Sequence, residues 1–214
     1  MEIYEIQKMV CDAGVRMFET GLVVGTWGNI SVRVDDVCMV VTPSGMSYQK
    51  LKPDQMVVVN IHDLSYPGDL KPSMEAPLHA AIYRARPDVN AILHNHSTAA
   101  CTVAAAHVDV PAILDDEVQI VGGPIRVAEY SLPGTTVLGQ NALERLGDRN
   151  AVLLANHGAV CLGRNLEEAF VTAQVVEKSC RVFLDAQSLG GAKELLPSQV
   201  DFMRNFFLER YGQR

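Results

Sequence analysis

The sequence predicts an α/β protein with three layers, in which helices cover a mixed, mostly antiparallel central sheet. Two observations predict this class. Short β-rich runs alternate irregularly with segments of helical periodicity, and an early pair of β-rich runs reads as a hairpin. The hairpin, residues 29–34 and 39–41 around Asp35-Asp36, argues against a wholly parallel sheet. The chain contains no internal repeat, low-complexity tract or long linker, so we expect residues 1–214 to form one domain.

Helical periodicity and capping residues mark the elements in order. Apolar residues recur at steps of three and four from Ile3, and Gly21 stops that helix. Ser73 is the expected N-cap of a second helix, with Glu75 in its first turn. Asn165, followed by Glu168, resembles a capping box that starts a long helix. The remaining predicted strands cover residues 56–61, 91–96, 125–130 and 151–155, and the remaining helices cover about 97–107, 136–146 and 198–211.

Composition excludes several classes of function. The formal net charge of −7 argues against nucleic acid as a partner, because phosphate binding requires a basic surface. No apolar stretch approaches the roughly 20 residues that span a bilayer, so no membrane association is expected. The 5 cysteines are scattered and form no CxxC pair. This distribution is typical of a reduced, cytoplasmic protein with ordinary thiols.

Three histidines are candidate metal ligands. His94 and His96 end an apolar run at spacing i, i+2, so both side chains would project from one face of a strand. His157 ends a second apolar run, in Asn156-His157-Gly158. Three histidines with an open coordination position describe a catalytic metal site better than a closed structural one.

Glu75 and two glycine-containing turns are the other polar features that could carry chemistry. Glu75 is either a first-turn glutamate stabilised by the helix dipole or a carboxylate beside the metal. The turns are Gly25-Thr26-Trp27-Gly28-Asn29 and Thr42-Pro43-Ser44-Gly45. Their backbone N–H groups could approach an anion, and the hydroxyl of Ser73 could serve the same anion.

Five motifs together resemble one known family. They are Gly28-Asn29-Ile30-Ser31, Thr42-Pro43-Ser44-Gly45, Lys71-Pro72-Ser73-x-Glu75, His94-x-His96 and Asn156-His157-Gly158. Each motif is weak alone, but in this order and spacing they are similar to the class II aldolase/adducin family, in particular its fuculose-phosphate aldolase branch. The resemblance runs from the first helix to the carboxyl end.

The resemblance implies a metal-dependent aldolase that cleaves and forms a C–C bond of a short ketose phosphate through an enediolate. It implies that His94, His96 and His157 hold a catalytic Zn²⁺, with Mn²⁺ or Co²⁺ as other ions that such a site accepts. It implies that Glu75 is the acid/base carboxylate and that Tyr211 reaches an active site from the end of the chain. The residues matching the substrate-phosphate site are Gly28, Asn29, Ser44, Gly45 and Ser73. By the same resemblance we expect a homotetramer with active sites between subunits.

Two departures from the aldolase pattern leave more than one function open. Met74 stands where that branch usually has a second serine, which removes one phosphate donor. Asp115 stands where it carries a catalytic tyrosine, and the run Asp115-Asp116-Glu117 is either functional or a solvated acidic turn. An aspartate in this region resembles a ribulose-phosphate 4-epimerase, although that enzyme has aspartate in place of Glu75. The family also includes sugar-acid-phosphate decarboxylases, with which the sequence is compatible, and non-catalytic, adducin-like binding modules, against which the three histidines and Glu75 argue.

Overall fold

Seven strands form the central sheet of the computed structural model, which describes residues 2–212. Their order is β3-β2-β1-β4-β7-β6-β5. Every neighbouring pair is antiparallel except β5 and β6, which are parallel, so the predicted mixed and mostly antiparallel sheet is confirmed. The strands are β1 (Asn29–Arg33), β2 (Cys38–Val41), β3 (Val57–Asn60), β4 (Ala91–Asn95), β5 (Arg126–Ala128), β6 (Ala151–Leu154) and β7 (Gly158–Gly163).

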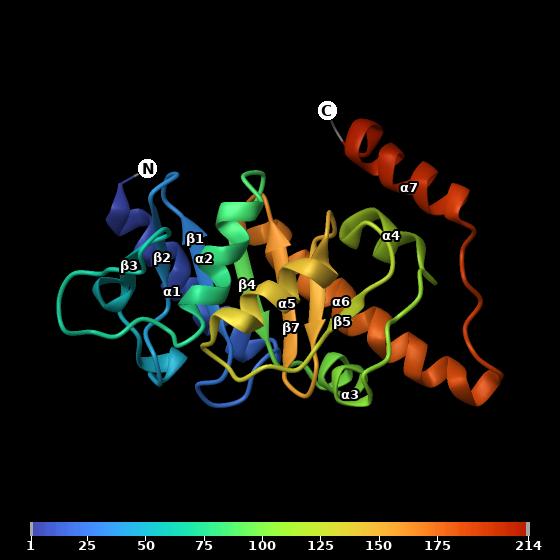
Figure 1. Ribbon diagram of the computed structural model, residues 1–214, viewed down its shortest axis with the longest axis horizontal. Helices are drawn as coiled ribbons and strands as arrows, with labels where there is room; N and C mark the ends of the chain where they lie inside the picture. The colour runs from blue at the N-terminus through green and yellow to red at the C-terminus, as the bar shows by residue number, and fades with distance from the viewer. Residues whose placement is uncertain (1, 213–214) are drawn as a thin grey trace.

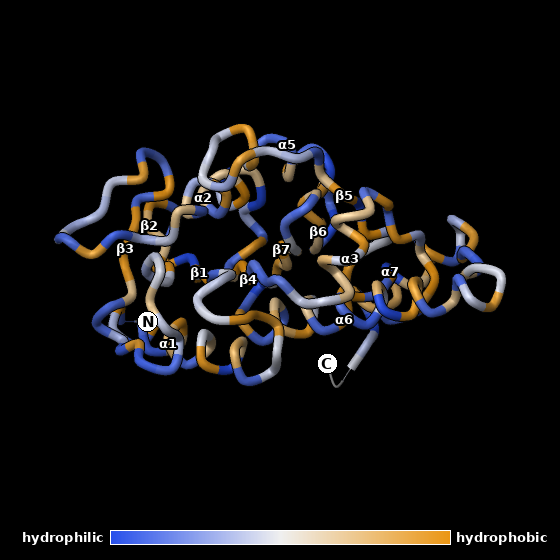
Figure 2. Tube along the Cα trace, turned by 90° about the horizontal axis from the view of Figure 1, so that it is seen from below, coloured by the Kyte–Doolittle hydropathy of each residue, from blue (hydrophilic) through white to orange (hydrophobic). Residues whose placement is uncertain are grey.

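Helices cover both faces of the sheet, as Figure 2 shows in a view along it. On one face α2 and α5 pack over an apolar cluster, and on the other α1, α3 and α6 pack over a second cluster. The clusters follow strand alternation: Leu93 and Cys161 belong to one, whereas Ile92 and Leu162 belong to the other. The helices are α1 (Ile3–Glu19), α2 (Ala76–Ala85), α3 (Thr98–Ala106), α4 (Asp115–Val121), α5 (Thr136–Leu146), α6 (Leu166–Ala186) and α7 (Pro197–Arg210), with short 3₁₀ turns at Tyr48–Lys50, Pro53–Gln55 and Gln187–Leu189. No helix in the described part of the chain is long and apolar enough to cross a membrane.

Two predicted helix starts require correction. The N-cap of α2 is Glu75 and not Ser73, because the Glu75 carbonyl accepts the first helical i→i−4 bond, from the His79 N–H at 3.2 Å, whereas the Ser73 carbonyl accepts from the Ala76 N–H in a tighter turn. Ser73 instead accepts a hydrogen bond from the Glu75 N–H through its hydroxyl, at 3.2 Å. At α6 the Asn165 side chain caps the Glu168 N–H as predicted, but the Glu168 carboxylate accepts from Arg164, so the box is only half formed.

Two elements were not predicted. The acidic run Asp115-Asp116-Glu117 is the first turn of α4 and not a solvated turn, since Glu117 is fully buried. Strand β7 follows β6 after only three residues and is buried along its whole length. Helices α4 and α7 pack together at one end of the molecule, and Arg204 of α7 donates to the carbonyl of Ile120 at 3.2 Å (Figure 1).

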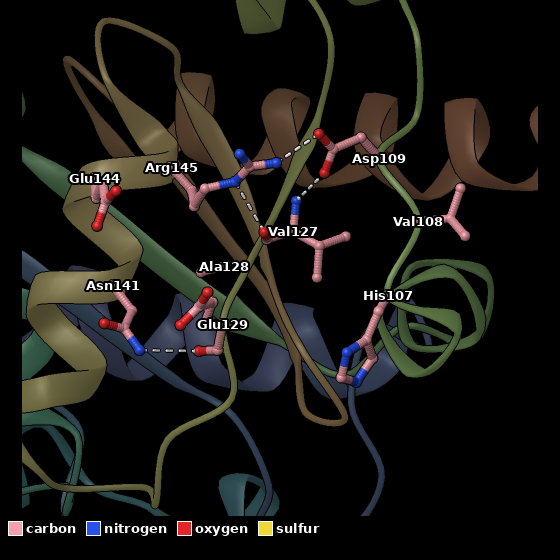
Figure 3. Close-up of a pocket in the computed structure, with 9 residues that line it drawn as sticks. All are labelled: His107, Val108, Asp109, Val127, Ala128, Glu129, Asn141, Glu144 and Arg145. Carbon is pink, nitrogen blue, oxygen red and sulfur yellow. Dashed lines mark hydrogen bonds and ion pairs between the residues drawn. The ribbon is translucent and has the colours of Figure 1, made fainter.

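Side chains close the sheet edge at β5, as Figure 3 shows. Asp109 Oδ1 accepts a hydrogen bond from the Val127 N–H at 2.8 Å, and Arg145 Nε donates to the Val127 carbonyl at 3.0 Å. Arg145 and Asp109 also form an ion pair with each other at 2.5 Å. The central residue of β5 therefore has both of its outward-facing backbone groups paired with side chains.

Candidate metal centre and active site

Pairing of β4 with β7 brings the three predicted histidine ligands together. His94 lies near the end of β4 and pairs with Val160 of β7, while His96 lies just beyond the same strand. His157 lies in the turn immediately before β7. One ligand nitrogen from each of the three side chains lies within 4.8 Å of the other two. This cluster can hold a metal ion.

The His94 imidazole is oriented for metal binding. It is fully buried, and its Nδ1 lies 3.0 Å from the Ala159 carbonyl oxygen. A carbonyl only accepts, so Nδ1 carries a proton and Nε2 is the nitrogen left to bind a metal. His96 Nε2 lies 2.9 Å from His94 Nε2. Tetrahedral zinc with ligand distances of 2.0–2.1 Å would separate two nitrogens by about 3.3 Å, so the pair is close to ligand spacing.

Gly158 makes room for this cluster. A Cβ at this position would lie 2.4 Å from the Asn95 carbonyl oxygen, 2.9 Å from His96 Cδ2 and 3.3 Å from His94 Cε1. Any side chain there would push β7 away from β4 and displace the two imidazoles. The glycine of the Asn-His-Gly motif is therefore a packing requirement of the histidine cluster.

Glu75 places a carboxylate against the histidines. Its Oε2 lies 3.1 Å from His94 Nε2 and accepts a hydrogen bond from Asn29 Nδ2 at 2.8 Å, and its Oε1 lies 3.5 Å from His157 Nε2. Burial raises the pKa of Glu75, but the His94 and His157 imidazoles and the Asn29 amide lower it more, so the pKa lies well below its ordinary value. Glu75 is therefore ionised inside the site.

The histidines differ in their preferred charge state. Burial and the nearby His94 lower the pKa of His96 to about 3 and that of His157 to about 4, so both are neutral at physiological pH. Burial also acts to lower the pKa of His94, but the Glu75 carboxylate raises it above the ordinary value. Neutral imidazoles beside an ionised carboxylate suit a divalent cation, because metal ligands must present lone pairs.

A cavity of about 260 Å³ opens beside the cluster and joins it to the predicted anion turns. Ser44, Gly45 and Ser73 line it together with Gly28 and Asn29, so all five predicted substrate-binding residues face one space. A backbone bridge between Pro43 and Pro72, with the Ser44 N–H bonded to the Lys71 carbonyl at 3.0 Å, holds the two serine segments side by side. The rest of the lining consists of Thr26, Trp27, Pro43, Met74, Glu75, His96, Pro133 and His157.

Tyr48 supports the glycine turn and was not predicted from the sequence. Its hydroxyl donates to the Gly28 carbonyl at 2.7 Å, and its ring lies against Gly14, where a Cβ would come within 2.6 Å. Gly28 has φ +80°, and a Cβ there would lie 2.7 Å from the His94 carbonyl oxygen. A glycine in the middle of a helix, as Gly14 is in α1, was the available sequence signal for a large neighbour.

Asp115 and Tyr211 lie outside the cavity of their own chain. Asp115 is exposed at the first turn of α4, and Tyr211 is 56% exposed directly after α7. Figure 1 places α4 and α7 at the top of the molecule, whereas α3, which begins just after His96, lies at the bottom. Within one chain, these two residues are not part of the histidine site.

A three-histidine cluster beside a buried carboxylate, at the wall of a cavity, is typical of a catalytic metal site. Residues 8–184 match the family Class II Aldolase and Adducin N-terminal domain, and the chain belongs to that family. The resemblance predicted from the five motifs is confirmed.

Relatives of known activity and known structure agree with this assignment. A 5-deoxy-D-ribulose 1-phosphate aldolase of Bacillus thuringiensis serovar kurstaki is 35% identical over 202 residues, which cover 94% of each chain. A solved structure of an L-fuculose 1-phosphate aldolase superposes with a TM-score of 0.91 at 32% identity, covering 95% of this chain and 96% of that one. A 3-oxo-tetronate 4-phosphate decarboxylase of Haemophilus influenzae is 31% identical over 185 residues, 85% of this chain and 88% of its own.

Proposed function

We propose that the protein is a metal-dependent class II aldolase that reversibly cleaves a short ketose 1-phosphate into dihydroxyacetone phosphate and an aldehyde. The observation that carries the proposal is a cluster of three histidines beside Glu75, next to a cavity that His96, His157, Glu75 and two serine segments line. The similarity to sugar-phosphate aldolases supports the same reaction class.

His94, His96 and His157 would hold Zn²⁺, and Mn²⁺ or Co²⁺ would fit the same nitrogen ligands. When bound, the cation supplies a Lewis acid that stabilises the negative charge developing on the substrate oxygens. The Ala159 carbonyl fixes the His94 ring for this role, and the side of the cluster that faces the cavity remains accessible to substrate.

Glu75 would move the proton. In condensation the ionised carboxylate removes a proton from the carbon that then bonds to the aldehyde, and the aldehyde oxygen takes up a proton to become a hydroxyl. In cleavage that hydroxyl gives up its proton as the C–C bond breaks, and protonated Glu75 returns its proton to the carbon. Its placement at the cavity wall, with Oε1 free of any hydrogen bond from the described residues, leaves that oxygen available to a substrate. Asn29 holds the other oxygen, which orients the carboxylate.

The substrate phosphate would lie between Ser44, Gly45 and Ser73. These residues offer hydroxyl and backbone N–H donors, and Gly45 has φ +68°, a left-handed backbone that suits glycine. Met74, which is 66% exposed, lines the same cavity and donates no hydrogen bond. We therefore propose a phosphorylated substrate that is held by few, neutral donors.

Asp115 and Tyr211 would act in the site of a neighbouring subunit of a homotetramer. Both are exposed and absent from the lining of their own cavity, and Phe202 on α7 is also exposed, at 67%. Mixing His94→Ala chains with Tyr211→Phe chains tests this arrangement. Hybrid oligomers should regain activity, because some sites then combine an intact metal centre with an intact neighbouring tyrosine, whereas no regain would place Tyr211 outside the site.

The second candidate is decarboxylation of a sugar-acid phosphate, which the Haemophilus influenzae relative favours. An epimerase of the ribulose-phosphate type would use the same metal and phosphate groups, with Asp115 in the proton transfer. A binding module without catalysis, similar to adducin, is disfavoured because a scaffold has no need of Glu75 beside three metal ligands. The five free thiols favour a reducing, cytoplasmic setting.

The test is metal analysis followed by an assay of dihydroxyacetone phosphate with a panel of short aldehydes. We expect about one zinc per chain and condensation products that disappear with a chelator and return with zinc. Bound metal without condensation, but with carbon dioxide release from a 3-oxo acid phosphate, would establish the decarboxylase instead. Failure to bind any divalent metal would refute the enzyme proposal.

A further inference from the structure

A row of polar side chains lies between β1 and α2, on the face of the sheet where the surrounding core is apolar. On the strand its members are every second residue, and on the helix they are every fourth. Two residues of a strand advance about 6.6 Å, and four residues of a helix advance about 6 Å. Successive members therefore stay opposite one another along the whole contact. The row pairs Asn29, Ser31 and Arg33 of β1 with Glu75, His79 and Tyr83 of the α2 segment.

The middle of this row is a buried hydrogen-bonded cluster of three side chains. Ser31 Oγ lies 2.7 Å from His79 Nδ1 and 2.9 Å from Tyr83 Oη. Ser31 and His79 are fully buried, and Tyr83 is 1% exposed. Burial, together with the nearby His94, lowers the pKa of His79 to about 3, so its ring is neutral. These are neutral, directional hydrogen bonds in a buried interface.

The two ends of the row tie the helix to the strand. At the carboxyl end of α2, Arg33 donates to the carbonyls of Tyr83 at 2.8 Å and Arg86 at 3.0 Å, and its guanidinium lies 4.7 Å above the Tyr83 ring. Cations at a helix C-terminus also interact favourably with the helix dipole. At the other end Asn29 donates to Glu75, the N-cap of α2.

Strand β1 also connects the polar row to the metal centre, because it pairs with β4, the strand that contains His94. Asn29 of β1 pairs with His94 of β4, and Ser31 pairs with Ile92. The row therefore fixes α2, which begins at the Glu75 carboxylate, against the two strands that place the His94 imidazole. A slide or rotation of α2 over β1 would change the 3.1 Å separation between Glu75 Oε2 and His94 Nε2.

An apolar contact would hold α2 equally well but would not define its register. Leu78 and Ile82 of the same helix are buried in the surrounding apolar cluster, and such contacts tolerate small shifts. Hydrogen bonds are lost when donors and acceptors slide apart, and a buried polar group that loses its partner is costly. The hydrogen-bonded row between β1 and α2 therefore favours one position of the helix along the strand.

We propose that Ser31, His79 and Tyr83 are positioning residues that set the register of α2 on β1 and so hold the Glu75 carboxylate in place against the His94 imidazole. The inference rests on the proposed function, in which Glu75 moves the proton. It adds three residues that touch neither substrate nor metal.

The test uses the full-length, zinc-loaded protein and compares Tyr83→Phe and Ser31→Ala with the control Ile82→Val. The control lies in the same helix, is fully buried and takes no part in the row. Measured quantities are kcat, KM for the aldehyde and dihydroxyacetone phosphate, bound zinc and Tm. We expect kcat to fall about 10-fold in both row variants, with KM within about two-fold and zinc content unchanged, because small misplacements of a reacting group reduce turnover strongly.

Ile82→Val should lower Tm without lowering kcat, and Ser31→Thr, which keeps the hydroxyl, should recover most of the kcat lost in Ser31→Ala. Wild-type kcat in Tyr83→Phe and Ser31→Ala would overturn the inference, as would an equal loss in Ile82→Val. Glu75→Gln separates the two levels of the proposal. If it abolishes turnover while the row variants do not, only the positioning role fails; if it leaves turnover intact, the proton-transfer role fails as well.

Discussion

Two buried glutamates in different regions of the molecule have opposite pKa shifts. Glu75, at the start of α2 beside the histidine cluster, is 7% exposed and has a pKa well below its ordinary value. Glu117, in the first turn of α4, is fully buried and has its pKa raised to about 8. Burial is the largest influence on both, and in both it raises the pKa.

Neighbouring groups decide the outcome. Around Glu75 the imidazoles of His94 and His157 and the amide of Asn29 stabilise the carboxylate more than burial destabilises it. Around Glu117 the Ile113 N–H, the Ser179 hydroxyl and the Lys178 ammonium stabilise the charge, but too weakly to offset burial. The first glutamate is held as an anion for chemistry, and the second is a neutral part of the core at pH 7.

The largest expected effect comes from His94→Ala, which removes the group that most lowers the pKa of Glu75. It also removes the candidate metal ligand whose ring orientation is fixed by the Ala159 carbonyl. We expect zinc binding to be lost and aldolase activity to fall at least 10³-fold. Metal analysis and the condensation assay measure both, and full zinc content in this variant would contradict the proposed centre.

Glu75→Gln and Glu117→Gln are matched substitutions that separate the two glutamates by function. Glu75→Gln should lower kcat by about 10²- to 10⁴-fold with zinc still bound, because general acid–base catalysis contributes in this range. Glu117→Gln should leave kcat unchanged, since Glu117 contacts no residue of the cavity in the described chain. Equal kcat values for the two variants would refute the distinction.

Glu117 should also make stability depend on pH. Its folded pKa of about 8 lies above the ordinary value of 4.5, so the folded protein holds a proton that the unfolded chain releases. The free energy of unfolding should therefore fall as pH rises from 4.5 to 8, by at most about 1.4 kcal/mol per pH unit. Denaturant unfolding of the wild type and Glu117→Gln at pH 5 and pH 8.5 measures this. Parallel losses in both proteins would assign the pH dependence to other groups.

The smallest expected effect is that of Ser73→Ala, which changes the surroundings of Glu75 without changing any charge. The hydroxyl accepts from the Glu75 N–H and lines the cavity. We expect KM for a phosphorylated substrate to rise about 5-fold with kcat within two-fold, the loss expected for one neutral hydrogen bond. An unchanged KM would remove Ser73 from the phosphate site, and a large loss of kcat would assign it to the placement of Glu75.

Sequence reasoning found the elements whose signals are local. The hairpin around Asp35-Asp36, the helix at residues 136–146 and the Asn165 cap each depend on neighbouring residues alone, and each is present. Strand β7 was missed because Gly158–Gly163 is buried on both faces and shows no alternation of apolar and polar residues. Helix α4 was missed because three consecutive acids resemble a surface turn, and nothing local indicates that Glu117 is buried.

The sequence indicated the residues of the site itself, but not the residues that hold them in position. The spacing of His94 and His96 and the family motifs indicated the metal ligands, whereas the arrival of His157 depends on the pairing of β4 with β7. Tyr48 beneath Gly28 and the Ser31–His79–Tyr83 cluster depend on contacts between residues more than 15 positions apart. No local pattern in the sequence contains such contacts.

The closed edge at β5 restricts how copies of this chain can join. A strand that presents free N–H and C=O groups invites another strand to extend the sheet, which leads to open-ended polymers. At Val127 both groups are occupied, by the carboxylate of Asp109 and the guanidinium of Arg145 (Figure 3). At this edge a second copy of the chain would therefore meet side chains and not free backbone groups, which leaves β3 as the opposite edge strand of the sheet.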